Sequence, residues 1–148
     1  MNPFKKVMSY TWKGFNAVYW PVFLHCAGMA MTQVALDVQS PKITNESQLE
    51  QVIAEERMKI DPQNDYTIMG DLVDEDEGCA YWCGYDLYGI SIGGSHANVT
   101  TVRHELYHIL DDHLVESDGP TASFPDLLMY LFWHEPQATI YQATGIKL

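Results

Sequence analysis

The chain has few cysteines, and their scarcity excludes one class of small protein. Its 148 residues include three cysteines, Cys26, Cys79 and Cys83. An odd and sparse set does not make the disulfide framework of a small secreted domain, so we expect a reducing, cytoplasmic compartment. The spacing of Cys79 and Cys83, CxxxC, fits neither a zinc knuckle nor a redox CxxC pair, which favours roles as small buried hydrophobes.

Basic residues are also scarce. Twenty acidic residues against eight basic ones give the chain a net charge of −12. Such a charge repels phosphate backbones and anionic lipid headgroups, so the sequence predicts neither a direct nucleic-acid partner nor a membrane partner. The same charge would attract a basic protein substrate, although keeping the protein soluble is its simpler use. Nothing in the sequence indicates the oligomeric state.

A clean apolar run long enough to cross a membrane is missing as well. The nearest candidate, 15–36, is rich in Val, Phe, Ala and Met. Five polar or helix-breaking residues interrupt it: Asn16, Pro21, His25, Thr32 and Gln33. We therefore expect core helices rather than a signal peptide or a membrane span. Pro21 should divide the region into two helices, about 4–20 and 22–38.

The remaining pattern predicts one domain over 41–148, with 1–40 as a helical extension packed on it. Asn45 can cap an amphipathic helix, with Gln48 in the capping-box position and Asp61 at the end. The spacing of apolar residues predicts three short strands, 66–69, 79–85 and 87–92, with an acidic turn at 71–77 after the first. It also predicts two later helices, 99–114 and 124–143, and Asn98 can cap the first of them. Helices, then a small three-stranded sheet, then helices predict an α+β fold.

The strongest motif is His104-Glu105-Leu106-Tyr107-His108. At 100° per residue the two histidines differ by about 40° on a helix, so both imidazoles can bind one metal ion. Zinc suits nitrogen ligands and needs no redox partner. Glu105 flanks the histidines and fits the base that takes a proton from a metal-activated water. Apolar residues fall on the opposite side of this helix: Val99, Val102, Leu106 and Ile109.

A catalytic zinc ion normally takes a third protein ligand. The candidates are Asp111, Asp112, His113, His134 and Glu135. The first three lie on the motif helix. Asp111 and Asp112 lie too far along the helix axis from His104 to share its ion, and His113 faces the apolar side of the helix. Asp111 is better suited to support His108. The next helix must therefore supply the ligand. Glu135, which interrupts an apolar run, is the best choice, and His134 is the alternative.

From 48 to 146 the chain resembles the ImmA/IrrE-type metallopeptidases. The resemblance consists of a helix, a small sheet ending in Tyr88-Gly89-Ile90-Ser91-Ile92, the run Val102 to His108, and Glu135-Pro136-Gln137-Ala138. In that family the two motif histidines and a glutamate of a downstream E-x-x-A helix bind zinc, and the motif glutamate is the catalytic base. The resemblance implies a zincin-like fold, with His104, His108 and Glu135 as ligands and Glu105 as base. It also implies a protein substrate inside the cell, such as a basic helix-turn-helix regulator.

Two residues depart from that family's pattern. Tyr107 stands where the family has glycine, which puts a bulky ring near the expected metal. Pro136 directly follows Glu135; it fits the first turn of a helix but should kink a continuous one.

Other interpretations use the same motif. Peptide deformylases also carry HExxH, and Gly28 to Gln33 together with Glu77-Gly78-Cys79 resemble their other two elements, which would make Cys79 the third ligand. Against this, Tyr107 replaces the aspartate of their motif. A further alternative is a catalytically inactive protein that zinc stabilises and that uses 1–40 as a binding interface.

For the peptidase we expect an extended substrate along the edge of the strand that ends near Ile92. The oxyanion would then be stabilised by Tyr107, His134 or Tyr141, among which the sequence does not choose.

Overall fold

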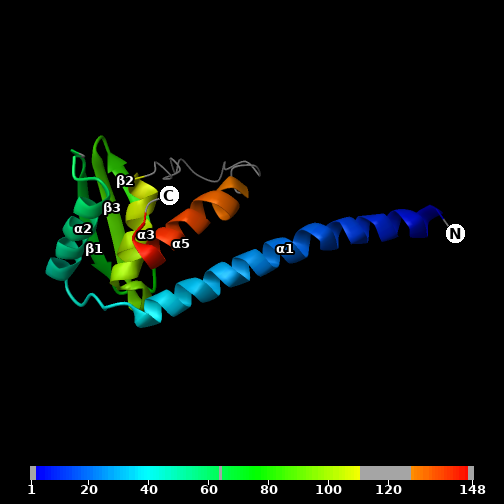
Figure 1. The fold of residues 1–148 in the computed structure, drawn as a ribbon, viewed down its shortest axis with the longest axis horizontal. Coiled ribbons are helices and arrows are strands. Elements are labelled where there is room, and N and C mark those ends of the chain that lie inside the picture. The colour runs from blue at the N-terminus through cyan, green and yellow to red at the C-terminus, as the bar shows by residue number, and fades with distance from the viewer. Residues whose placement is uncertain (1–2, 64, 111–127, 147–148) are drawn as a thin grey trace. The chain divides into compact units, whose positions relative to one another are not determined.

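The structure, a computed structural model, describes residues 3–63, 65–110 and 128–146. The chain divides into two compact units, Met1–Thr32 and Gln33–Leu148. The described residues form four α-helices and one three-stranded sheet (Figure 1), which confirms the α+β class. Asp111, Asp112 and His113 lie outside the described residues, as do the end of the expected helix 99–114 and the start of 124–143.

Helix α1, Pro3–Gln39, makes up the described part of the first unit and continues into the second. It runs through Pro21 without interruption, so the prediction of two helices is wrong. A proline removes one backbone hydrogen bond, and the hydrogen bonds of the turns on both sides continue the helix past it. Only 6% of its most apolar window, Tyr19–Gln39, is buried.

Helix α2, Glu46–Ile60, begins and ends as the sequence predicts. The Asn45 side chain accepts a hydrogen bond from the Gln48 N–H at 3.0 Å, which satisfies one free donor of the first turn. The Gln48 side chain accepts from the N–H of Thr44 at 2.9 Å, one residue before the expected cap. At the other end the Asp61 N–H donates to Arg57 O at 2.9 Å. Leu49 and Ile53 are the buried apolar residues of this helix.

The sheet contains β1 (Thr67–Val73), β2 (Gly78–Gly84) and β3 (Leu87–Gly93) in the order β1-β3-β2. β3 is parallel to β1 and antiparallel to β2. All three expected strands are present, and β1 extends into the stretch that the sequence assigns to an acidic turn. The turn between β2 and β3 needs positive φ angles, 112° at Gly84 and 48° at Tyr85. Gly84 adopts its angle without strain, because it has no Cβ.

Helices α2 and α3 (Val99–Leu110) pack on the same face of the sheet. Side chains of both helices and of β3 form one buried cluster that includes Leu49, Val102, Leu106 and Ile90. The apolar face that the sequence predicts for α3 is therefore confirmed. Gly70 lets α2 approach β1, because an added Cβ would lie 2.6 Å from Leu49 Cγ.

The last helical segment combines two kinds of turn. A π-helical turn, Tyr130–His134, leads directly into α5, Glu135–Thr144. The N–H of Glu135 bonds to Tyr130 O, five residues back. Pro136 has no N–H to donate, and it lies in the first turn of α5, where a helix needs none. The π turn thus joins the two segments where the sequence predicts a kink.

Candidate metal centre

Helix α3 places the two motif histidines side by side in the interior. His104 and His108 are 4% and 5% exposed, and their Nε2 atoms lie 3.1 Å apart. The apolar residues on the other side of α3 hold the helix against the sheet, so its histidine face turns away from that core. The spacing of four residues therefore places both imidazoles on one face of the helix, as helical geometry predicts.

Glu135 from α5 completes the group. Its Oε2 lies 3.4 Å from His104 Nε2, and its Oε1 lies 3.4 Å from His108 Nε2. Two ligands that bind zinc at about 2.0–2.1 Å with tetrahedral angles are about 3.4 Å apart, so these three side chains fit such an ion. The donor atoms of all three lie within 4.8 Å of one another. His104, His108 and Glu135 could hold a divalent cation.

These three side chains shift one another's pKa values. Burial would raise the pKa of Glu135, but hydrogen bonds from His104 and His108 hold it well below its usual range. Burial would lower the pKa of His104, but the bond to Glu135 and the charges of Glu105 and Glu135 together outweigh burial, so the pKa is raised. The carboxylate therefore draws positive charge to the point between the two imidazoles.

Tyr130 supports this group from the π turn. Its ring stacks on His108 with centroids 5.9 Å apart, and its hydroxyl hydrogen-bonds to Glu135. Burial, together with that bond, raises the pKa of Tyr130, so the hydroxyl stays protonated and donates. Sequence reasoning missed Tyr130; its position five residues before Glu135 points to the site only once the π turn is known.

Glu105 lies beside the metal group without belonging to it. The side chain is buried, and its carboxylate accepts a hydrogen bond from the Ala80 N–H of β2. Burial raises the pKa of Glu105, and the two nearby histidines oppose that effect. A Cβ on Gly78 would lie 2.7 Å from Thr101 Cγ2, so the glycine lets β2 lie close to α3 beside Glu105. Glu105 lines the cavity, where a base can reach a bound water or substrate.

A cavity of about 680 Å³ opens onto these residues. Its wall includes the three metal-site side chains, Glu105 and residues 76–82 of β2 and the turn before it. Asp76 and Glu77 give that wall negative charge. The volume lies within the range of cavities that bind small ligands or peptide side chains.

Within the part of the chain that the structure describes, β2 lies at an edge of the sheet and β3 does not. β3 is the central strand, so the expectation of a substrate along its edge is wrong. In β2 the Glu77 carbonyl accepts from Gly93 N, and bonded pairs recur at every second residue of an antiparallel ladder. The backbone groups of Gly78, Ala80 and Trp82 therefore point away from β3. The bond from the Ala80 N–H to Glu105 agrees with this orientation.

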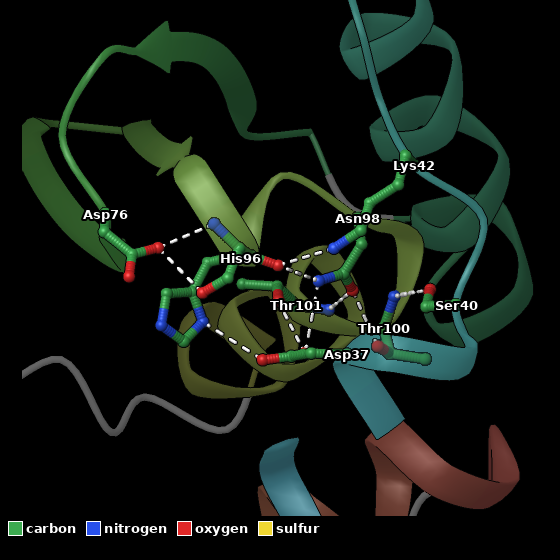
Figure 2. A network of polar contacts seen from close by, with 9 residues as sticks. Asp37, Ser40, Lys42, Asp76, His96, Asn98, Thr100 and Thr101 are labelled. Atoms are coloured by element: carbon green, nitrogen blue, oxygen red, sulfur yellow. Dashed lines mark hydrogen bonds and ion pairs between the residues drawn. The ribbon is translucent and has the colours of Figure 1, made fainter. Parts of the chain in front are cut away.

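A buried polar network fixes the turn that leads into α3 (Figure 2). Asn98 Oδ1 accepts from Thr101 N at 3.0 Å, which confirms the predicted N-cap. Asp37 accepts from the Asn98 amide and the Thr101 hydroxyl, each at 3.2 Å. The same carboxylate lies 3.2 Å from His96 Nδ1. His96 lines the cavity, and no motif spacing could have found it, because its partner is 59 positions away.

The other sequence candidates lie apart from the metal group. Cys79 lines the cavity and does not join the cluster, and it is exposed, so the expectation of a buried residue is wrong. Partial desolvation of the thiol and the nearby Glu77 raise its pKa, which disfavours the thiolate that a metal needs. His134 is outside the cluster too.

Tyr107 does not crowd the metal group, so the expectation of a ring near the metal is wrong. The residue is fully buried, and its ring lies 5.6 Å from that of Tyr141, in a second core cluster with Ala138. Its hydroxyl donates to Gln137 at 3.4 Å. Among the described residues that line the cavity there is neither Tyr107, Tyr141 nor His134, so the expected oxyanion donors do not face it.

Comparison of the chain with protein-family models, with curated proteins and with solved structures finds no match.

Proposed function

We propose that this protein is a zinc-dependent metallopeptidase with a zincin-like catalytic unit. The observation that carries the proposal is the convergence of His104, His108 and Glu135 next to Glu105. Two histidines and a glutamate form one of the ligand sets of catalytic zinc, which leaves a coordination position open for chemistry. The set comes from two helices, as the resemblance to ImmA/IrrE-type enzymes implies.

Residues of the chain itself supply the other requirements of peptide hydrolysis. A zinc ion, when bound, would act as a Lewis acid toward the scissile carbonyl and the attacking water. Glu105 takes a proton from that water and returns it to the leaving amine. The Ala80 N–H keeps the Glu105 carboxylate oriented. Tyr130 holds Glu135 in place through its hydroxyl.

The edge formed by β2 supports a peptide as the substrate class. An extended peptide can pair with the outward backbone groups of Gly78 and Trp82 and with the carbonyl of Ala80, and that edge borders the same cavity as the metal group. Asp76 and Glu77 on the cavity wall, and the net charge of −12, favour a basic peptide. A basic DNA-binding regulator is a protein substrate of this kind.

Metal content tests the proposed centre. We expect the purified full chain to retain about one equivalent of zinc, as measured by inductively coupled plasma mass spectrometry. Glu135→Ala should lose most of it, because one of three ligands is gone, whereas Cys79→Ser should retain it. The reverse pattern would favour a deformylase-like centre built on Cys79 and would refute the ligand set.

Peptide hydrolysis tests the activity. The zinc-loaded chain is incubated with a proteome-derived peptide library, and new peptide termini are identified by mass spectrometry. We expect cleavages enriched near Lys and Arg that disappear in Glu105→Gln. Full zinc occupancy with no new termini would instead indicate a zinc-stabilised binding protein.

A further inference from the structure

The region before the catalytic unit contains a long uncharged segment. Between Lys13 and Asp37 lie 23 residues without Asp, Glu, Lys or Arg. Three lysines, Lys5, Lys6 and Lys13, stand before the segment. Twenty-three residues of α-helix measure about 35 Å, enough to cross a hydrocarbon core of about 30 Å.

The structure makes this segment more suitable for a membrane than the sequence alone indicates. Pro21 does not divide it, because α1 is one helix from Pro3 to Gln39. All but a few backbone groups of the segment are therefore bonded within the helix, as a bilayer interior requires. The Thr32 hydroxyl donates to Gly28 O at 2.9 Å and so needs no water either.

The apolar side chains of the segment are exposed. Tyr19, Trp20 and Phe23 form a cluster with ring centroids 5.5–6.0 Å apart, and each is about half exposed. Leu24 and Met31 are 64% and 70% exposed. At 100° per residue these five side chains fall within an arc of about 140°. An apolar surface of this size on a soluble protein indicates a contact with another apolar body.

The chemistry of the segment points to lipid. Aromatic residues with polar edges, such as Tyr19 and Trp20, are typical of the level of the headgroups, and lysines typically lie just outside it. Mostly apolar residues, interrupted by His25 and Thr32, then continue to Gln33, which lines the cavity of the metal centre. We propose that the first 19 residues of the segment, 14–32 of α1, insert into a lipid bilayer and anchor the chain there. The proposal replaces the expectation of a chain without a membrane partner, and it does not depend on the metal centre.

Partition into vesicles tests the proposal. The full chain is synthesised in a cell-free system with phosphatidylcholine vesicles, which carry no net charge that the acidic protein would avoid. Vesicles are then floated on a density gradient and washed with alkaline carbonate. We expect the wild-type chain to float and to resist the wash, because an inserted helix is not extracted by alkali.

Matched glutamate variants distinguish insertion into the bilayer from nonspecific adsorption to the vesicles. Met31→Glu and Leu24→Glu should each lower the floated fraction by at least about tenfold, with the larger effect at the more central Leu24. Met58→Glu makes the same change at another exposed methionine, 62% exposed in α2, and should float like the wild type. Zinc content, measured on each variant, should not change.

Four outcomes would overturn the proposal. The wild-type chain could stay at the bottom of the gradient, or carbonate could release it. Leu24→Glu and Met31→Glu could float as well as the wild type. Mass spectrometry of the chain produced in cells could show that the segment has been removed. Loss of zinc in wild type would bear on the proposed function alone, so the two proposals fail separately.

Discussion

The change Glu105→Gln separates the chemistry of the site from its architecture. Glutamine has the shape of glutamate, and its carbonyl oxygen can still accept the hydrogen bond from Ala80 N–H. The amide cannot take a proton from water. General bases typically contribute factors of about 10²–10⁴, so we expect hydrolysis to fall by that amount, or about 3–5 kcal/mol of barrier. His104, His108 and Glu135 are untouched, so zinc content should remain that of the wild type.

The stability of Glu105→Gln should not fall with its activity. The Glu105 carboxylate is 7% exposed, and burying an ionised group is costly, whereas a hydrogen-bonded amide is buried at lower cost. The midpoint of thermal unfolding of Glu105→Gln should therefore equal or exceed that of the wild type. Loss of activity with unchanged or higher stability is typical of a group that serves catalysis.

Glu77→Gln is the matched control. It makes the same chemical change on the wall of the same cavity, but Glu77 is exposed and only accepts a bond from the Ser91 hydroxyl at 2.8 Å. We expect its kcat to stay within a few-fold of the wild type, with any loss confined to a higher KM for a basic peptide, because Glu77 contributes only charge to the cavity wall. If Glu105→Gln kept more than about a tenth of the activity, or if both variants lost activity equally, the assignment of Glu105 as the base would be refuted.

Three further predictions follow from the packing around the site. Tyr130→Phe removes the hydroxyl that bonds to Glu135 and should weaken zinc binding about 10–100-fold in competition with a chelator, whereas unchanged affinity would contradict a supporting role. Burial would raise the pKa of Glu56, but hydrogen bonds from Arg103 (2.9 Å) and Lys59 lower it. The Glu56 carboxylate therefore stabilises the fold above its pKa in the unfolded chain, and this contribution is lost as the pH falls through its pKa in the folded chain. In urea unfolding from pH 3 to 7, the free energy of unfolding of Glu56→Gln should fall less steeply toward acid pH than that of the wild type. Leu106→Ala, at a fully buried position, should lower the free energy of unfolding by about 2–5 kcal/mol, and a cost below about 1 kcal/mol would contradict the packing of α3 on the sheet.

Local patterns account for most of the fold. Alternating side chains predict the strands, and the Asn45 and Asn98 caps predict where α2 and α3 begin, because each feature depends on neighbours within a few residues. The order of the strands does not follow from such patterns. β3 lies between β1 and β2, and this arrangement depends on which faces pack together, so the sequence led to the wrong substrate edge.

Local patterns also predict one part of the site and leave the rest unpredicted. His104, Glu105 and His108 share one helix, so spacing alone brings them together. Glu135 was expected on the weaker ground that an apolar run is interrupted and that a known family has a glutamate there. Asp37 and His96 meet only in three dimensions, and Tyr130 reaches Glu135 only because of a π turn. Periodicity of a regular helix cannot anticipate either arrangement.

The two residues that most weaken the motif in the sequence have structural explanations that leave the metal group intact. Tyr107 sits between the histidines in sequence, but its side chain leaves α3 in a different direction and packs against Tyr141 of α5. That contact joins the helix that carries the two histidines to the helix that carries Glu135. Pro136 lies where α5 needs no N–H, and the π turn before it aligns Tyr130 with Glu135. Both departures from the family pattern thus help to position the third side chain of the centre, so replacing Tyr107 by glycine should loosen the contact between α3 and α5 rather than improve the site.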